Sequence, residues 1–311
     1  MNTGLRHLMI AAVICTSAIL QPTYTQSRTD EPQKKPVNRT GSHPSKDRAG
    51  MTPEMRAVVE QAMVVICTQQ KLDPSASVPI DEMQARPSLP VHNPEAQAGL
   101  ARAQRVLPTA KSLVISSLRQ LVADYGFQHS RRYRYKIQLA INRVRAVRRI
   151  RPDVESRDNA SVFLSRPQTI TFGTIFLAGL RSDEGMISVL SHELMHIADG
   201  EVDSLRTLVR AVSLRASDLT GLDIGGQRAE ELTCDLIGAM AVRSFVLNSP
   251  SYESIARRLA RSVEHNCVQI DEGDEDHLSP RDTIRALLAV NPTLARELIY
   301  DRHDVQPPRK N

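Results

Sequence analysis

The chain has 311 residues, of which 41% are apolar, so it can bury the core of one large domain or two smaller ones. Aromatic residues make up only 4% and tryptophan is absent, which favours an aliphatic, mainly helical core over a large sheet. The net charge is +5. After the first 20 residues no segment is long and apolar enough to cross a bilayer, which argues against a multi-span membrane protein.

The first residues have the pattern of a signal peptide. Arg6 and His7 precede an apolar run over residues 8–20, which is too short to span a bilayer comfortably. We therefore predict a signal peptide over 1–25 and an exported protein, periplasmic or secreted; the alternative is an uncleaved anchor. Residues 26–50 are rich in Pro, Lys, Arg and Ser and are predicted to form a flexible linker. Export makes nucleic acid a poor candidate partner.

Residues 51–127 are predicted to form an N-terminal helical region. Thr52 is suited to cap a helix that has Pro53 at its first position. Proline-rich residues 74–93 are expected to form a loop, and apolar periodicity predicts a second helix over about 108–125.

The pattern then changes to short strands. Residues 133–139 alternate polar and apolar side chains with period two, and 160–164 and 169–176 are further candidate strands. A small sheet without repeated βαβ units predicts an α+β fold. We assign the main domain to 128–302 and a C-terminal tail to 303–311.

A helix of four to five turns is predicted between Ser182, a suitable N-cap, and Gly200, a natural stop. Its apolar stripe consists of Met186, Ile187, Leu190, Leu194 and Ile197. Further helices are expected over about 204–219, 228–247 and 252–266, and from about 281.

The sequence HELMH, residues 192–196, lies on this predicted helix. Residues four apart project from one helix face, so His192 and His196 can hold two corners of a zinc tetrahedron. Glu193 lies beside the first ligand, where a metallohydrolase needs its general base. The alternative is a pair of surface histidines on an ordinary helix.

A catalytic zinc site usually has three protein ligands. The metzincin pattern is absent, because Asp199 and Val202 stand where it requires Gly and His. Glu231 is the candidate third ligand, and Asp235, one turn further along, is a candidate acceptor for the outer nitrogen of a ligand histidine. Gly238 lies on the same face and allows another backbone to approach closely.

HExxH followed by ExxxD resembles the gluzincin metallopeptidases, most closely the M48 family of peptidases. The resemblance covers about 130–290 and includes "NASVF" at 159–163 and "ELTCDLIG" at 231–238, where Cys234 replaces the usual alanine. Pro280 and Arg285 match the spacing of the family's His-Pro segment, whereas His277 is displaced from its usual place directly before the proline.

This resemblance implies a mainly helical zincin fold with a small sheet beside the HExxH helix, one zinc ion per chain and hydrolysis of protein or peptide substrates. Glu193 would be the general base, and His277 and Arg285 would be candidate transition-state or gating residues. An edge strand around 169–176 would pair with an extended substrate.

Two other function classes remain open. One is a non-catalytic or latent, chaperone-like protein that keeps the metal site. The other uses the arginine-rich segment 131–151 to associate weakly with an anionic envelope surface. The simpler interpretation of that segment is a solvated strand face.

The cysteine count is odd once the signal peptide has been removed. Cys15 leaves with the signal, and Cys67, Cys234 and Cys267 remain. Reflecting the helix at 228–247 through the break near 249–250 brings Cys234 close to Cys267, so we predict a disulfide between them. The alternatives are a Cys67–Cys267 disulfide or three free thiols.

Overall fold

The computed structural model describes residues 50–300, except 74, 77, 79, 164, 201–204 and 264–272. The predicted signal peptide over 1–25, nearly all of the linker over 26–50, the tail over 303–311 and Cys267 lie outside the described residues. In the described part, none of the helices combines the length and the apolar character that a bilayer span requires.

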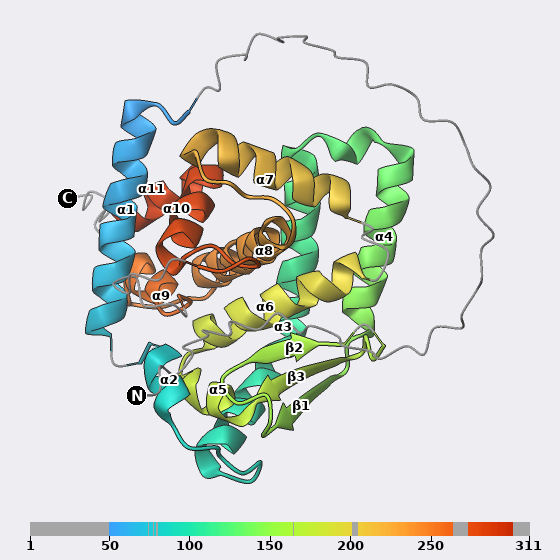
Figure 1. The fold of residues 1–311 in the computed structure, drawn as a ribbon, viewed down its shortest axis with the longest axis vertical. Helices are drawn as coiled ribbons and strands as arrows, with labels where there is room; N and C mark the ends of the chain where they lie inside the picture. Colours follow the sequence, from blue (N-terminus) through green and yellow to red (C-terminus); the bar gives the residue numbers. More distant parts are fainter. Residues whose placement is uncertain are drawn as a thin grey trace, which may run out of the picture.

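Helices dominate the structure and a three-stranded sheet lies at one side, which confirms the predicted α+β class (Figure 1). The helices are α1 (Pro53–Leu72), α2 (Ile80–Ala85), α3 (Pro94–Asp124), α4 (Arg131–Ala146), α5 (Thr174–Gly179), α6 (Asp183–Asp199), α7 (Arg206–Thr220), α8 (Gln227–Asn248), α9 (Ile255–Ala260), α10 (Pro280–Val290) and α11 (Pro292–Ile299), with a short 3-10 turn, η1 (Phe127–His129). The strands are β1 (Arg149–Asp153), β2 (Ala160–Val162) and β3 (Thr169–Gly173).

The sheet has the order β1-β3-β2, with β1 parallel and β2 antiparallel to β3. The predicted edge strand at 169–176 is therefore wrong in two respects. β3 is the central strand, and the chain turns into α5 at Thr174. Because both sides of β3 are already paired, its backbone cannot pair with a substrate. The edge strand that packs against α6 is β2.

The predicted strand at 133–139 is also wrong, because these residues lie within α4. Ser130 caps this helix by accepting a hydrogen bond from the Tyr133 backbone N–H at 3.2 Å. Its buried residues recur with helical spacing: Tyr133, Ile137, Ala140, Ile141 and Val144. The alternation over seven residues resembled a strand, whereas the longer window follows the period of a helix.

Helix α3 is much longer than the predicted 108–125. It begins at Pro94, where the Asn93 side chain caps the first backbone N–H groups, and Pro108 lies inside it. The short helix α2 occupies part of the predicted loop at 74–93. The predicted helix at 252–266 is represented in the described residues by α9.

Helix α3 runs through the centre of the molecule and packs against α5, α6 and α8. A side chain at Gly99 would place its Cβ 2.0 Å from the Leu177 carbonyl oxygen, so only glycine allows α3 to lie this close to α5. Buried residues such as Leu118, Ile141 and Leu190 belong to one hydrophobic core that spans the predicted N-terminal region and main domain.

Helix α6, which carries HELMH, is held at both ends. Ser182 accepts a hydrogen bond from the Gly185 N–H at 3.0 Å, as the sequence predicted. At the other end Gly200 has a positive φ of 70°. The Arg143 guanidinium of α4 donates to the carbonyl oxygens of Ala198 at 3.0 Å and Asp199 at 2.8 Å. A cation at a helix C-terminus is favourable because it offsets the negative end of the helix dipole.

Candidate metal centre

The centre lies between α6 and α8, which pack side by side (Figure 1). Gly238 of α8 makes this close packing possible, because a Cβ there would already lie 3.2 Å from the Ser188 carbonyl oxygen of α6. The prediction that Gly238 permits a close backbone approach is thus confirmed.

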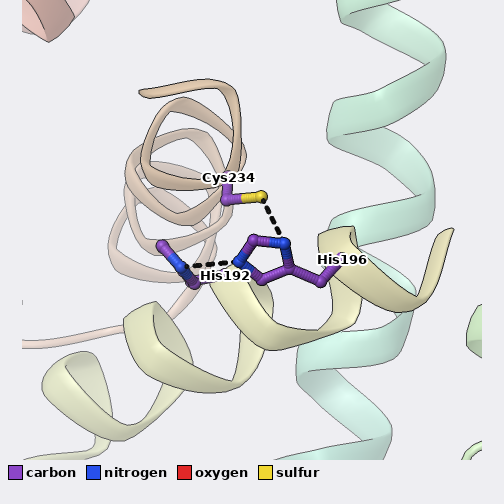
Figure 2. A group of neighbouring side chains, drawn as sticks. All are labelled: His192, His196 and Cys234. Atoms are coloured by element: carbon purple, nitrogen blue, oxygen red, sulfur yellow. Dashed lines mark hydrogen bonds between the residues drawn. The ribbon is translucent and has the colours of Figure 1, made fainter. Parts of the chain in front are cut away.

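Three predicted ligand atoms converge at one point. The Nε2 atoms of His192 and His196 lie 3.1 Å apart (Figure 2). The Glu231 Oε2 atom lies 3.1 Å from the first of these nitrogens and 3.5 Å from the second. All three side chains are largely buried, with exposed fractions of 22%, 16% and 8%.

A second carboxylate orients each histidine ring. The Nδ1 atom of His192 lies 2.8 Å from the Asp235 carboxylate, the partner expected from the sequence. The Nδ1 atom of His196 lies 2.9 Å from the Glu230 carboxylate, which the sequence reasoning considered in no such role. When Nδ1 carries the proton and donates it to a carboxylate, Nε2 is left with a lone pair that faces the point of convergence.

Cys234 also belongs to this cluster, and together with His192 and His196 it forms a group that could hold a metal ion. Its Sγ atom lies 3.6 Å from Nδ1 of His196, on the side of the ring that faces away from His192 (Figure 2). The sulfur therefore contacts the ring nitrogen that Glu230 also contacts. This position suits a neighbour of the ligand better than a ligand at the Nε2 convergence.

The predicted Cys234–Cys267 disulfide is wrong. Cys234 is buried and not in a disulfide, whereas Cys67 is in one. The physical reason is the direction of the Cys234 side chain, which faces the histidine on α6. Burial raises the pKa of the Cys234 thiol, although the two histidines counteract this effect.

Opposite charges shift the pKa values inside the centre. Burial by itself lowers the pKa of His192, but hydrogen bonds to Asp235 and Glu231 raise it well above 6.5. The pKa of His196 is raised in the same direction by Cys234, Glu230 and Glu231, against the effect of burial. Burial raises the pKa of Glu231, but hydrogen bonds from both histidines lower it well below 4.5. The carboxylate of Glu231 is therefore ionised, as a metal ligand must be.

Glu193 lies on the buried side of α6, with 7% of its surface exposed. Burial raises the pKa of its carboxyl group, and the positive charges of His192 and His196 act in the opposite direction. A carboxylate next to the ligand cluster is in the position that a general base needs.

His277 approaches the cluster from the segment before α10. Its Nε2 atom lies 3.8 Å from the Glu231 Oε2 atom, and its Nδ1 atom lies 3.2 Å from the Asp274 carboxylate. Arg228 holds this segment by donating to the Asp274 carbonyl oxygen at 2.9 Å. A hollow of about 20 Å³ remains beside His277, Glu231 and Asp235, which is room for about one water molecule.

Arg285 is not brought to the centre. Its guanidinium group contacts Glu60 of α1 at 3.3 Å and Asp282 at 3.1 Å. These contacts connect α10 to α1, so the predicted transition-state or gating role for Arg285 is not supported.

The structure thus gathers the four residues predicted as ligands or ligand partners, His192, His196, Glu231 and Asp235. It also brings His277, a predicted transition-state or gating residue, beside Glu231. It adds Glu230, Cys234 and Gln227, whose side-chain amide donates to Glu231 at 3.0 Å. The spacing contained a signal for two of these, since Gln227 and Glu231 are one helical turn apart and Glu230 adjoins Glu231.

No protein-family model, curated protein or solved structure matches the chain. The geometry of the centre itself is therefore the basis for assigning a function.

Proposed function

We propose that this protein is a zinc-dependent peptidase with one zinc ion per chain, bound by His192, His196 and Glu231. The observation that carries the proposal is the triangle formed by the three ligand atoms, whose sides measure 3.1, 3.1 and 3.5 Å. In a tetrahedral zinc site with bonds of about 2.0–2.1 Å, neighbouring ligand atoms are about 3.3 Å apart. The donor set also fits, because two imidazoles and one carboxylate are common ligands of catalytic zinc.

Zinc bound there would polarise a substrate carbonyl group and make a water molecule more acidic. The chain's own residues supply the proton transfers. Glu193 accepts a proton as water oxygen bonds to the carbonyl carbon, and it passes that proton to the nitrogen as the C–N bond breaks. His277, whose Nε2 atom lies 3.8 Å from the Glu231 Oε2 atom, is the candidate residue to contact a substrate oxygen.

The proposed substrates are proteins or peptides bound in an extended form. The outer edge of β2 is the candidate pairing edge, because β2 packs against α6 whereas β3 is paired on both sides. We also propose that the protein works in the periplasm or outside the cell. The disulfide at Cys67 supports an oxidising compartment.

The test combines metal analysis with a cleavage assay on the exported protein. We expect about one zinc per chain, cleavage of casein or of a quenched peptide library, loss of cleavage on chelation, and recovery on addition of zinc. Stoichiometric zinc without cleavage of any substrate would favour the latent, chaperone-like alternative. Protein that binds no zinc in this assay would overturn the proposal.

A further inference from the structure

A basic groove lies over β1, an edge strand of the sheet, and reaches across β3 to the segment that connects β2 and β3. Its volume is about 720 Å³. Four arginines line it, Arg148, Arg149, Arg151 and Arg166. The rest of its lining includes Gln104 and Leu107 of α3, Phe163 after β2, and Thr169 and Thr171 of β3. We call it the arginine groove. Arg166 follows β2 in the sequence, so two separate segments of the chain supply the charge.

The positive charge of the arginine groove is largely uncompensated. None of the described residues that line the groove is acidic. Among the described residues, the four arginines have one acidic partner, Asp153, which lies 3.4 Å from Arg151. An adjoining hollow adds Lys111 and Arg145. Burial lowers the pKa of Lys111, and the positive charge of Arg148 lowers it further. A site that concentrates like charges in this way attracts an anionic partner.

The arginines repeat at the spacing of an extended chain. Arg149 and Arg151 are exposed on one face of β1, whereas Ile150 between them is buried. Two residues along a strand span about 6.6 Å, so a partner in extended conformation presents every second side chain at the same interval. Among the described strands β1 pairs with β3 alone, so no described strand pairs with its outer edge. Pro152 has no N–H, which limits pairing there to a short contact.

We propose that the arginine groove binds an extended acidic segment of a partner protein, with carboxylates at alternate positions paired to Arg149 and Arg151. Guanidinium groups bind carboxylates through two parallel hydrogen bonds, which suits a side-chain-by-side-chain match. The concave shape favours a single chain over a flat membrane surface. The groove shares no lining residue with the metal centre, so binding requires neither zinc nor hydrolysis.

Fluorescence anisotropy on the full chain tests this proposal. The probe is a labelled peptide with Glu at every second position, and the comparison is a peptide of the same composition with its Glu residues contiguous. The variant is Arg149→Glu combined with Arg151→Glu. The matched control is Arg131→Glu combined with Arg134→Glu, which makes the same charge change at exposed positions on α4. Circular dichroism and zinc content show whether each variant is folded.

We expect the alternating peptide to bind more tightly than the contiguous one, and the groove variant to weaken its binding at least about tenfold while the control changes it little. Removing zinc should leave this binding unchanged, so the result is independent of peptidase activity. No binding up to about 1 mM peptide would overturn the proposal. So would equal weakening by both variants, which indicates unspecific attraction. Binding to anionic vesicles or polyphosphate that needs Arg149 and Arg151, without peptide binding, would assign the groove to a phosphate-bearing surface instead.

Discussion

The Asp235 carboxylate lies 2.8 Å from the Nδ1 atom of His192, on the opposite side of the imidazole ring from Glu231. Asp235 and Glu231 are one turn apart on α8, so Asp235 contacts Nδ1 of the His192 ring and Glu231 contacts Nε2 of the same ring. The second pair in the centre, His196 and Glu230, repeats this arrangement at 2.9 Å. Ring orientation in this centre is thus set by α8, although the rings belong to α6.

Asp235→Ala should weaken zinc binding about 10–100-fold, because the His192 ring loses the acceptor that fixes its orientation. Asp235→Asn should weaken zinc binding less, since its amide oxygen can still accept the hydrogen bond. Competition with a chromophoric chelator measures both affinities. If Asp235→Ala binds zinc as tightly as the unmodified protein, the contact has no role in holding the metal.

Glu193→Gln should abolish peptide cleavage and leave the zinc content nearly unchanged. The amide cannot accept the proton, but it has almost the same volume, and Glu193 is not among the converging ligand atoms. Metal analysis and the cleavage assay on the same preparation are the measurements. A variant that loses its zinc, or one that keeps full activity, contradicts the assignment of Glu193 as the base.

Replacement of the two candidate third ligands distinguishes them. Glu231→Ala should lose zinc, because the triangle of ligand atoms loses one corner. Cys234→Ala should retain zinc, because its sulfur lies beside the outer nitrogen of His196. Glu230→Ala is the neighbouring control and should show only the 10–100-fold effect of a lost orienting contact. The reverse result, with zinc lost from Cys234→Ala alone, would make the cysteine the ligand.

The buried ion pairs of Asp73 should make the stability of the fold depend on pH. Its side chain is 1% exposed and accepts hydrogen bonds from Arg257 at 3.0 Å and Arg261 at 2.8 Å. Burial raises the pKa of Asp73, but hydrogen bonds from Ser75 and the two arginines lower it well below 3.8. Because the folded-state pKa is lower than the unfolded value, these contacts stabilise the fold above about pH 4, and their contribution is lost as the pH falls further.

Asp73→Asn should therefore lower the free energy of unfolding by about 3 kcal/mol near neutral pH, and the difference should shrink in acid. Urea unfolding at several pH values measures it. The control is Glu95→Gln, whose contact with Arg86 is exposed and should change stability by less than about 1 kcal/mol. A difference that stays constant down to pH 2 would show that the charge of Asp73 is not its cause.

Local signals located the helix of the motif and much of the centre. Ser182 and Gly200 mark the ends of α6 through their own capping chemistry, and the one-turn spacings of His192 with His196 and of Glu231 with Asp235 carry over directly into shared helix faces. Helix caps and one-turn spacings depend only on residues close together in the sequence, so they can be predicted from the sequence alone.

Features that depend on distant partners were missed. β1 contains a proline and only one buried residue, Ile150, and it forms by pairing with β3, about 20 residues later in the chain. Arg285 was assigned to the centre by motif spacing, yet its guanidinium group pairs with Glu60, 225 residues earlier in the chain. The predicted disulfide of Cys234 was based on how the chain folds back after α8. The Cys234 side chain instead lies on the face of α8 that packs against α6, where it contacts His196.

For the proposed zinc site, the close approach of α8 to α6 at Gly238 also determines when all three ligands become available. His192 and Glu231 are brought together only when these helices dock, because the residues between them must first fold back. A newly made chain would therefore offer only the His192–His196 pair to a metal ion until its core has assembled. Tight zinc binding would therefore follow folding of the core, and a metal ion would bind the unfolded polypeptide only weakly.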